Sequence, residues 1–256
     1  MTTRVAIIGN SHMGAYAAAR ATLSARFPDM RLSFFAFPDH RLTSATLDAQ
    51  GVLRAEARKG SALPDHIDLA AQDHILLVGQ PLGLTRLARL LSSVDVLGWI
   101  GLGLERSVSP TLLAEYTDAW VQKPLRTITR YFNDDPRLIV VPQPMVAPRA
   151  EIVEGRLSAL AHHPEAPRAL ALWREKLRAA AHDMQARVFF QPESLLTDPA
   201  HTHAHFARAT RLTDDQPAGP SDYTHMNEDY AVAHFTALTG AMFATAPTPE
   251  TQEELS

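Results

Sequence analysis

Short apolar runs of β type alternate along this chain with longer segments of helical pattern. The predicted strands are Arg4–Ile8, Arg31–Phe37, His74–Val78, Leu138–Val141 and Ala186–Phe190. The predicted helices are Gly14–Arg26, Leu82–Leu91, Pro110–Tyr131, Pro167–Gln185 and Glu228–Phe243. Strands and helices that alternate in this way are typical of an α/β fold with a mostly parallel sheet.

Three further segments affect the count of strands and domains. The apolar run Val94–Ile100 fits either a sixth strand or a buried turn of helix, because periodicity does not separate the two. The stretches Pro142–Pro148 and Ala161–Pro167 are predicted as loops, and neither is long or polar enough to link domains. We therefore predict one domain over residues 1–245 and a frayed polar tail over residues 246–256.

The composition excludes several classes of function. A chain of 256 residues that is 46% hydrophobic can bury one substantial core. Its 24 basic and 28 acidic residues are interspersed, so no patch is predicted for nucleic acid or an anionic membrane. The lack of cysteine excludes disulfides, thiolate chemistry and cysteine-ligated zinc. Because no apolar run approaches the ~18 residues of a membrane span, and Val5–Ile8 is too short for a signal-peptide core, we expect a cytoplasmic protein.

Two segments at opposite ends of the chain hold the candidate chemistry. Ser11 lies in a Gly-Asn-Ser-His segment directly after the first predicted strand, where its side chain and amide can face a cleft. Near the other end, Asp222 precedes His225 by three residues, so one loop can aim the carboxylate at the ring. A hydroxyl, an imidazole and a carboxylate are the groups that nucleophilic acyl transfer uses.

These segments resemble the SGNH hydrolases, the GDSL-like esterase superfamily. That family has its serine in a Gly-Asp-Ser turn after the first strand, and the turn here is Gly9-Asn10-Ser11. The family's last block is Asp-x-x-His, and the chain has Asp222-Tyr223-Thr224-His225. The resemblance implies a three-layer α/β/α fold of flavodoxin type with a mostly parallel five-stranded sheet.

By this resemblance, the chain is a serine esterase or acyl hydrolase that acts on a small or carbohydrate ester through an acyl-enzyme. Ser11 is then the nucleophile, His225 the general base and Asp222 the carboxylate that orients the ring. Some members of the family transfer the acyl group to sugar hydroxyls, so an acyltransferase that modifies a polysaccharide is the nearest alternative. No cofactor or metal is expected, and the ester substrate is the expected partner.

The resemblance also implies an oxyanion site, where N–H groups bind the negative oxygen of the reaction intermediate. The Ser11 amide is one implied donor. Family members add a glycine amide and an asparagine side chain from two central blocks, and neither block is clearly present here. Gly79 and Gln80 follow the third predicted strand, and Gly103 lies in a Gly-Leu-Gly-Leu segment; these are the alternatives. Because loss of one donor lowers the rate by about 10² to 10³, a slow hydrolase and a non-catalytic relative both stay open.

Two other interpretations belong to different classes of function. Gly9 and Gly14 match the outer glycines of a G-x-G-x-x-G dinucleotide fingerprint, with Asp39 as the ribose-binding acid. Ser11 replaces the middle glycine, however, and a side chain there obstructs the pyrophosphate. This interpretation leaves the Asp-x-x-His motif unexplained. In the second, structural interpretation, Ser11 only caps the following helix.

The remaining histidines give no metal site. His201, His203 and His205 alternate as ligands on a strand might, but Pro199 and the lack of a clear acidic partner favour a solvated loop. His12 directly follows the candidate nucleophile and is assigned no catalytic role.

Overall fold

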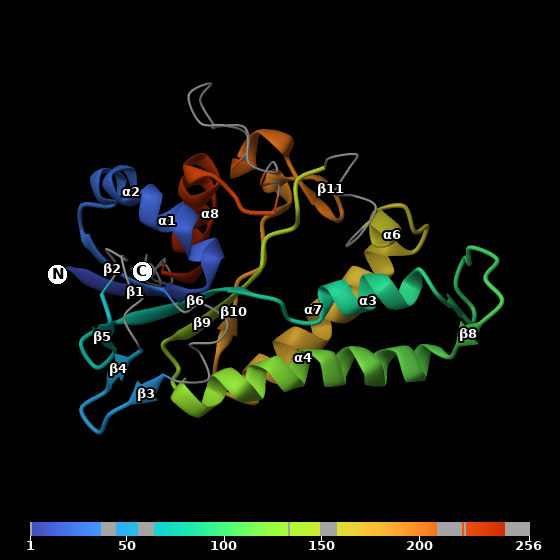
Figure 1. The fold of residues 1–256 in the computed structure, drawn as a ribbon, viewed down its shortest axis with the longest axis horizontal. Helices are drawn as coiled ribbons and strands as arrows, with labels where there is room; N and C mark the ends of the chain where they lie inside the picture. Colours follow the sequence, from blue (N-terminus) through green and yellow to red (C-terminus); the bar gives the residue numbers. More distant parts are fainter. Residues whose placement is uncertain are drawn as a thin grey trace, which may run out of the picture.

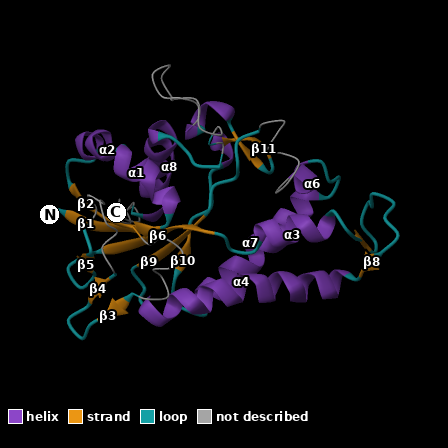
Figure 2. Ribbon diagram, in the orientation of Figure 1, coloured by secondary structure: helices purple, strands orange, loops and turns teal. Residues whose placement is uncertain are grey.

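A five-stranded parallel sheet forms the centre of the molecule (Figures 1 and 2). The computed structural model describes residues 2–36, 45–55, 64–132, 134–148, 158–208, 222 and 224–243. The central strands are β1 (Thr3–Gly9), β2 (Met30–Ala36), β6 (His74–Gln80), β9 (Leu138–Pro142) and β10 (Arg187–Val188). Their order, β2-β1-β6-β9-β10, is the flavodoxin-like order, and every neighbouring pair is parallel. The predicted α/β fold and its five strands are confirmed.

Helices cover both faces of this sheet, which explains why its strands are continuous apolar runs. In β1, Val5 and Ile7 pack into one layer, while Ala6 and Ile8 pack into the other. The first layer contains α1 (Gly14–Ala18), α2 (Arg20–Arg26) and α8 (Glu228–Met242). The second contains α3 (Leu84–Leu91), α4 (Pro110–Phe132), α6 (Ser158–Ala161) and α7 (Ala166–His182). The result is a three-layer α/β/α architecture.

The predicted helices are present, although some of their ends differ by a few residues. One predicted helix is divided into two. The segment predicted as Gly14–Arg26 is preceded by a 3₁₀ turn, η1 (Ser11–Met13), and is split into α1 and α2 at Ala19. Among the described residues, no helix has the length and apolar character needed to cross a membrane. The predicted tail, residues 246–256, lies outside the described residues.

Of the two predictions for the run Val94–Ile100, the helical one is wrong, and the strand is present only over Asp95–Val96 and outside the central sheet. Within the run, β7 (Asp95–Val96) pairs with β8 (Ser107–Val108) in a separate two-stranded parallel sheet, and Ile100 is 66% exposed. We call residues 94–109 the β7–β8 projection. Figure 1 shows β8 beyond the end of α4, away from α1. After the run, the chain turns back so that the amides of Leu102, Gly103 and Leu104 donate to the Asp95 carboxylate at 2.7–3.0 Å.

Several short elements were not predicted, because two or three residues are too few to show a period. They are β3 (Thr46–Leu47), β4 (Val52–Arg54), β5 (His66–Asp68), η2 (Glu193–Leu195), β11 (Leu196–Asp198), β12 (His201–Thr202) and η3 (Ala204–Phe206).

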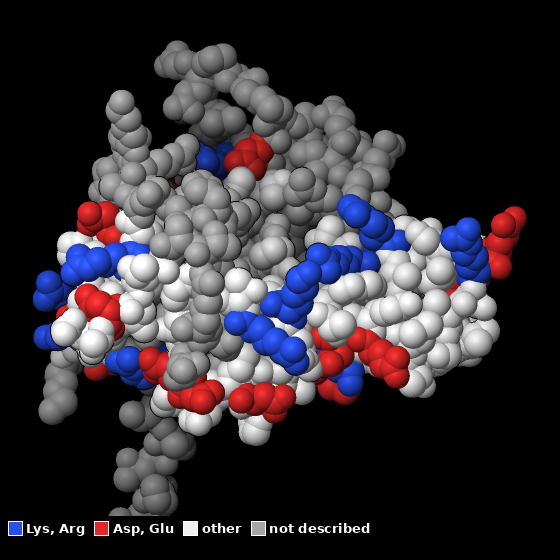
Figure 3. All heavy atoms as spheres, turned by 60° about the horizontal axis from the view of Figure 1, so that its bottom comes forward, with Lys and Arg blue, Asp and Glu red and all other residues white. Residues whose placement is uncertain are grey.

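On the face shown in Figure 3, Lys and Arg side chains form a narrow band with acidic side chains along one side.

Candidate active site

Ser11 lies at the carboxyl edge of the sheet, where β1 passes into η1. Its side chain is exposed, and as the first residue of the 3₁₀ turn its amide has no acceptor within that turn. The neighbouring Asn10 fixes the turn. Its Oδ1 accepts a hydrogen bond from His12 N at 3.1 Å, and its Nδ2 donates to the carbonyl of Gly79 at 2.6 Å. The turn after β1 is therefore tied to the end of β6.

Two glycines allow this close approach. Gly79 has a φ of +83°, and a Cβ there would lie 2.3 Å from Asn10 Oδ1. At Gly9, a Cβ would lie 2.5 Å from the carbonyl oxygen of Val78 on the neighbouring strand. Side chains at either position would push apart the two strand ends that hold Ser11.

The loop before α8 brings His225 and Asp222 to Ser11. Ser11 Oγ lies 2.7 Å from His225 Nε2, and His225 Nδ1 lies 2.8 Å from Asp222 Oδ2. The Asp222 carboxylate also accepts a hydrogen bond from the backbone N of His225 at 3.0 Å. Because an ionised carboxylate only accepts hydrogen bonds, the proton of the neutral ring is on Nδ1. Nε2 therefore accepts the hydrogen bond from the Ser11 hydroxyl.

Backbone contacts with residues 205–208 hold this loop in place. The His225 carbonyl accepts from Arg208 N at 2.9 Å, and Asn227 N donates to Phe206 O at 2.8 Å. The Asn227 side chain accepts from Tyr230 N, which caps α8, and donates to the His205 carbonyl at 2.7 Å. The position of the imidazole is thus fixed by both the helix start and the neighbouring segment.

The surroundings of Asp222 keep it ionised. Burial opposes the charge, but the hydrogen bond from the His225 amide and the nearby ring lower the pKa of Asp222 below its ordinary value. The guanidinium of Arg208, 3.9 Å from Asp222 Oδ2, adds to this effect. Asp222 is therefore available as a carboxylate to stabilise a protonated His225.

His12, predicted to have no role beyond contact with a substrate, is a neighbour of the site. It is 7% exposed, and its Nδ1 has no hydrogen-bond partner among the described residues. Burial, and then repulsion from His225, lower the pKa of His12 to about 4. The His12 ring is therefore neutral at neutral pH.

Comparisons with known proteins do not identify a family for this chain. No protein-family model and no curated protein sequence matches it. Among solved structures, the chain is similar to the periplasmic domain of a lipopolysaccharide acetyltransferase from Salmonella ser. Paratyphi A. The identity is 10% and the TM-score 0.41, over 95% of this chain and 84% of that chain. At this identity and TM-score, the likeness assigns neither a family nor an activity.

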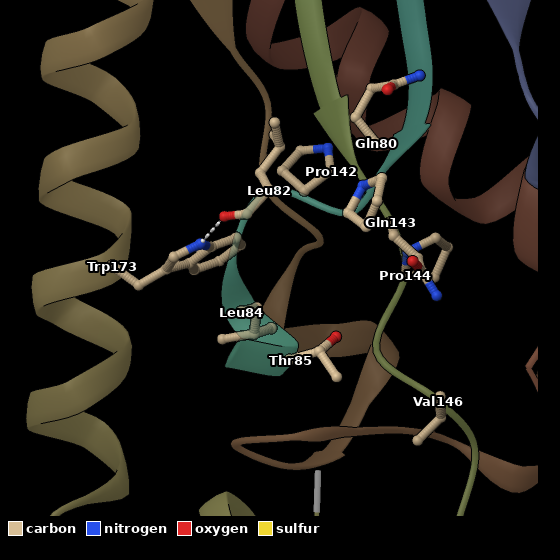
Figure 4. Close-up of a pocket in the computed structure, with 10 residues that line it drawn as sticks. Gln80, Leu82, Leu84, Thr85, Pro142, Gln143, Pro144, Val146 and Trp173 are labelled. Atoms are coloured by element: carbon tan, nitrogen blue, oxygen red, sulfur yellow. Dashed lines mark hydrogen bonds between the residues drawn. The ribbon is translucent and has the colours of Figure 1, made fainter. Parts of the chain in front are cut away.

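The three alternative oxyanion residues lie in different places. Gly79 contacts Asn10, as described above, and Gln80 follows it with a buried side chain whose carboxamide points away from Trp173 (Figure 4). Gly103 lies in the β7–β8 projection, where its amide donates to Asp95 Oδ2 at 3.0 Å. The structure thus brings Ser11, Asp222 and His225 into one hydrogen-bonded set and leaves Gly103 outside it.

A cavity of about 190 Å³ begins at Gln80. It lies where β6 and β9 end and α3 begins (Figure 4). It is lined by Gln80, Pro81, Leu82, Leu84, Thr85, Pro142, Gln143, Pro144, Val146 and Trp173. No periodic pattern marks this set, because its residues come from three separate segments.

The solvated loop predicted for His201, His203 and His205 is wrong for the first of them. His201 is 3% exposed in β12, and its Nδ1 lies 2.8 Å from Asp198 Oδ2, so it has the acidic partner that was not recognised. His203 and His205 stack on each other with centroids 5.5 Å apart. Within the described ranges, no group of three His, Asp or Glu side chains could hold a metal ion.

Proposed function

We propose that this protein is a serine esterase that transfers an acyl group through an acyl-enzyme on Ser11. The observation that supports the proposal is the unbroken set of hydrogen bonds from Ser11 Oγ through His225 to Asp222, at 2.7 and 2.8 Å. Such a set converts a weakly nucleophilic hydroxyl into one that can lose its proton as it attacks.

In this mechanism, Ser11 Oγ attacks the carbonyl carbon of the ester while His225 Nε2 accepts the hydroxyl proton. The carbonyl oxygen becomes negative, and the Ser11 amide is in position to donate to it. As the carbon–oxygen bond of the ester breaks, His225 returns the proton to the departing alcohol. The acyl group is then bound to Ser11 as a new ester.

The second half of the cycle releases the acyl group. Water, activated by His225, attacks the acyl-enzyme, and the carboxylic acid leaves as Ser11 regains its proton. A sugar or other alcohol hydroxyl can replace water in the same step, which would make the protein an acyltransferase. The two outcomes share the first half of the cycle and differ only in the acceptor, so product analysis with and without added alcohol distinguishes them.

The nucleotide-binding alternative explains less of the site. The Ser11 hydroxyl is bonded to His225, and the space beside Gly9 is filled by the backbone of Val78. Asp39, the candidate ribose-binding acid, lies outside the described residues. A structural cap, the other alternative, would not require a carboxylate and an imidazole to be aligned with the serine.

The test combines turnover and labelling. Wild-type protein should hydrolyse p-nitrophenyl acetate and react with a fluorophosphonate probe at Ser11, and Ser11→Ala should abolish both. Ser24→Ala, on the exposed side of α2, is the matched control and should retain both. Folded wild-type protein that shows neither turnover nor labelling would rule out the proposal.

A further inference from the structure

Gln80, in the wall of the cavity, is the chain neighbour of the glycine that binds the Ser11 turn. Gln80 follows Gly79, whose carbonyl binds Asn10, and Asn10 precedes Ser11. On its other side, Val146 accepts a hydrogen bond through its carbonyl from Thr202 N at 3.0 Å. Thr202 begins the stretch that leads to Arg208 and the His225 loop. The cavity is therefore bounded by the same segments that position the proposed catalytic residues.

The chemistry of the walls indicates an apolar ligand. None of the ten residues that line the cavity has a charged side chain, so it offers no counter-charge for a phosphate, a carboxylate or an ammonium group. Leu82, Leu84, Pro142 and Val146 are among its apolar residues. Such a lining favours a hydrocarbon chain, whose burial is stabilising without any hydrogen bond.

The ring of Trp173 forms part of the cavity wall and is held by a hydrogen bond. The Trp173 side chain is 3% exposed, and its indole Nε1 donates to the Leu82 carbonyl at 2.7 Å (Figure 4). This bond holds the ring against the loop after β6. The Trp173 ring therefore forms one wall of the cavity, against which the end of a chain can pack.

The alcohol part and the acyl part of an ester differ in how long they must stay bound at such a site. The alcohol half must leave so that water or another hydroxyl can approach, whereas the acyl half stays bound to Ser11. We infer that this cavity binds the acyl chain of the substrate and that the chain is short. The inference rests on the proposed role of Ser11 as the nucleophile.

The volume limits the length of the chain. In liquid water, one molecule occupies ~30 Å³. A cavity of about 190 Å³ therefore has room for about six groups of that size. The expected substrates are therefore esters of acyl chains of about four to six carbons, since a methylene and a water are of comparable size.

A series of p-nitrophenyl esters from acetate to decanoate tests this inference. In the wild-type protein, kcat/KM should rise up to about fourfold for each buried methylene, reach its maximum near butyrate to hexanoate, and fall for longer chains.

Two substitutions should change this profile in opposite directions. Thr85 is half-buried on α3 and lies across the cavity from Val146, so Thr85→Phe fills the cavity at little risk to the fold. It should reduce kcat/KM for hexanoate at least tenfold more than kcat/KM for acetate. Val146→Ala enlarges the cavity and should move the maximum to longer chains. Leu47→Phe, at an exposed position of β3, is the control for added bulk.

The outcomes separate the two proposals. If Ser11 is not a nucleophile, no ester of any length is turned over and no fluorophosphonate label appears, and the acyl-chain inference fails with it. If acetate is hydrolysed and Ser11 is labelled, but Thr85→Phe and Val146→Ala leave the chain-length profile unchanged, only the acyl-chain inference is overturned. Circular dichroism of each variant confirms that it is folded.

Discussion

The ring of His12 lies 4.8 Å from the ring of His225, measured between centroids, and is tilted from it by 39°. His12 is buried and neutral, so it fills the space behind the proposed base without adding a charge there. A positively charged side chain at this position would oppose protonation of His225 during the reaction.

The burial of His12 predicts a dependence of stability on acid. Its pKa is about 4 in the folded protein and 6.5 in the unfolded chain, so the unfolded chain binds more protons between these values. The free energy of unfolding should therefore fall as the pH drops from about 6.5 to about 4, with a contribution from His12 of up to about 3 kcal/mol.

Substitution His12→Phe keeps a ring and removes this protonation site. Denaturant titrations of wild-type and variant protein at several pH values should give a shallower acid slope for the variant. His162→Phe, at an exposed position, should keep the wild-type slope. Equal slopes for His12→Phe and wild type would show that His12 is not protonated on unfolding.

Substitution Asp222→Asn should reduce the rate without unfolding the protein. An asparagine amide can donate to Nδ1, which favours the ring tautomer with its proton on Nε2 and removes the acceptor for the Ser11 hydroxyl. From serine hydrolases with such a triad, we expect a loss of about 10³ to 10⁴ in kcat with little change in KM. Steady-state kinetics measure this, and a loss confined to KM would contradict the proposed role.

Gly79→Ala should affect both stability and activity. The new Cβ would meet Asn10 Oδ1 in a backbone conformation with a φ of +83°, and strain of this kind costs about 1–3 kcal/mol. Because Asn10 holds the Ser11 turn, kcat should fall as well. The matched control is Gly240→Ala in α8, where a Cβ meets open space. It should raise the free energy of unfolding by about 0.5–1 kcal/mol. Thermal melts compare the two, and equal shifts would contradict the close-approach argument.

The conformation of the β7–β8 projection should depend on the carboxylate of Asp95. Hydrogen bonds from the amides of Leu102, Leu104 and Gly103 lower the pKa of Asp95 below its ordinary value. Asp95→Ala leaves these amides without their acceptor, so hydrogen exchange over residues 102–104 should become faster while esterase activity is unchanged. Unchanged exchange would show that other contacts hold the loop.

The strands and the candidate triad were predictable because each has a local signal. The central strands are buried on both faces, so consecutive residues such as Ile7 and Ile8 are both apolar. Short continuous apolar runs of this kind indicate buried strands. Ser11 follows such a run directly, and Asp222 and His225 share one loop. The sequence could place these groups at one sheet edge but could not give the distances between them.

The remaining features depend on contacts between distant residues. The form of the β7–β8 projection depends on Asp95 binding amides seven to nine positions away, which no hydrophobic period records. The burial of His12 and of His201 depends on the segments that cover them. The wall of the cavity likewise depends on a hydrogen bond between Trp173 and Leu82, which are 91 positions apart.

The hydrogen bond between Ser11 and His225 joins positions 214 residues apart. A nascent polypeptide that has emerged only as far as β10 already contains all five central strands, yet its serine has no base. Catalytic competence would then arise only when the final helix docks, and the molecule would stay inert throughout most of its own synthesis.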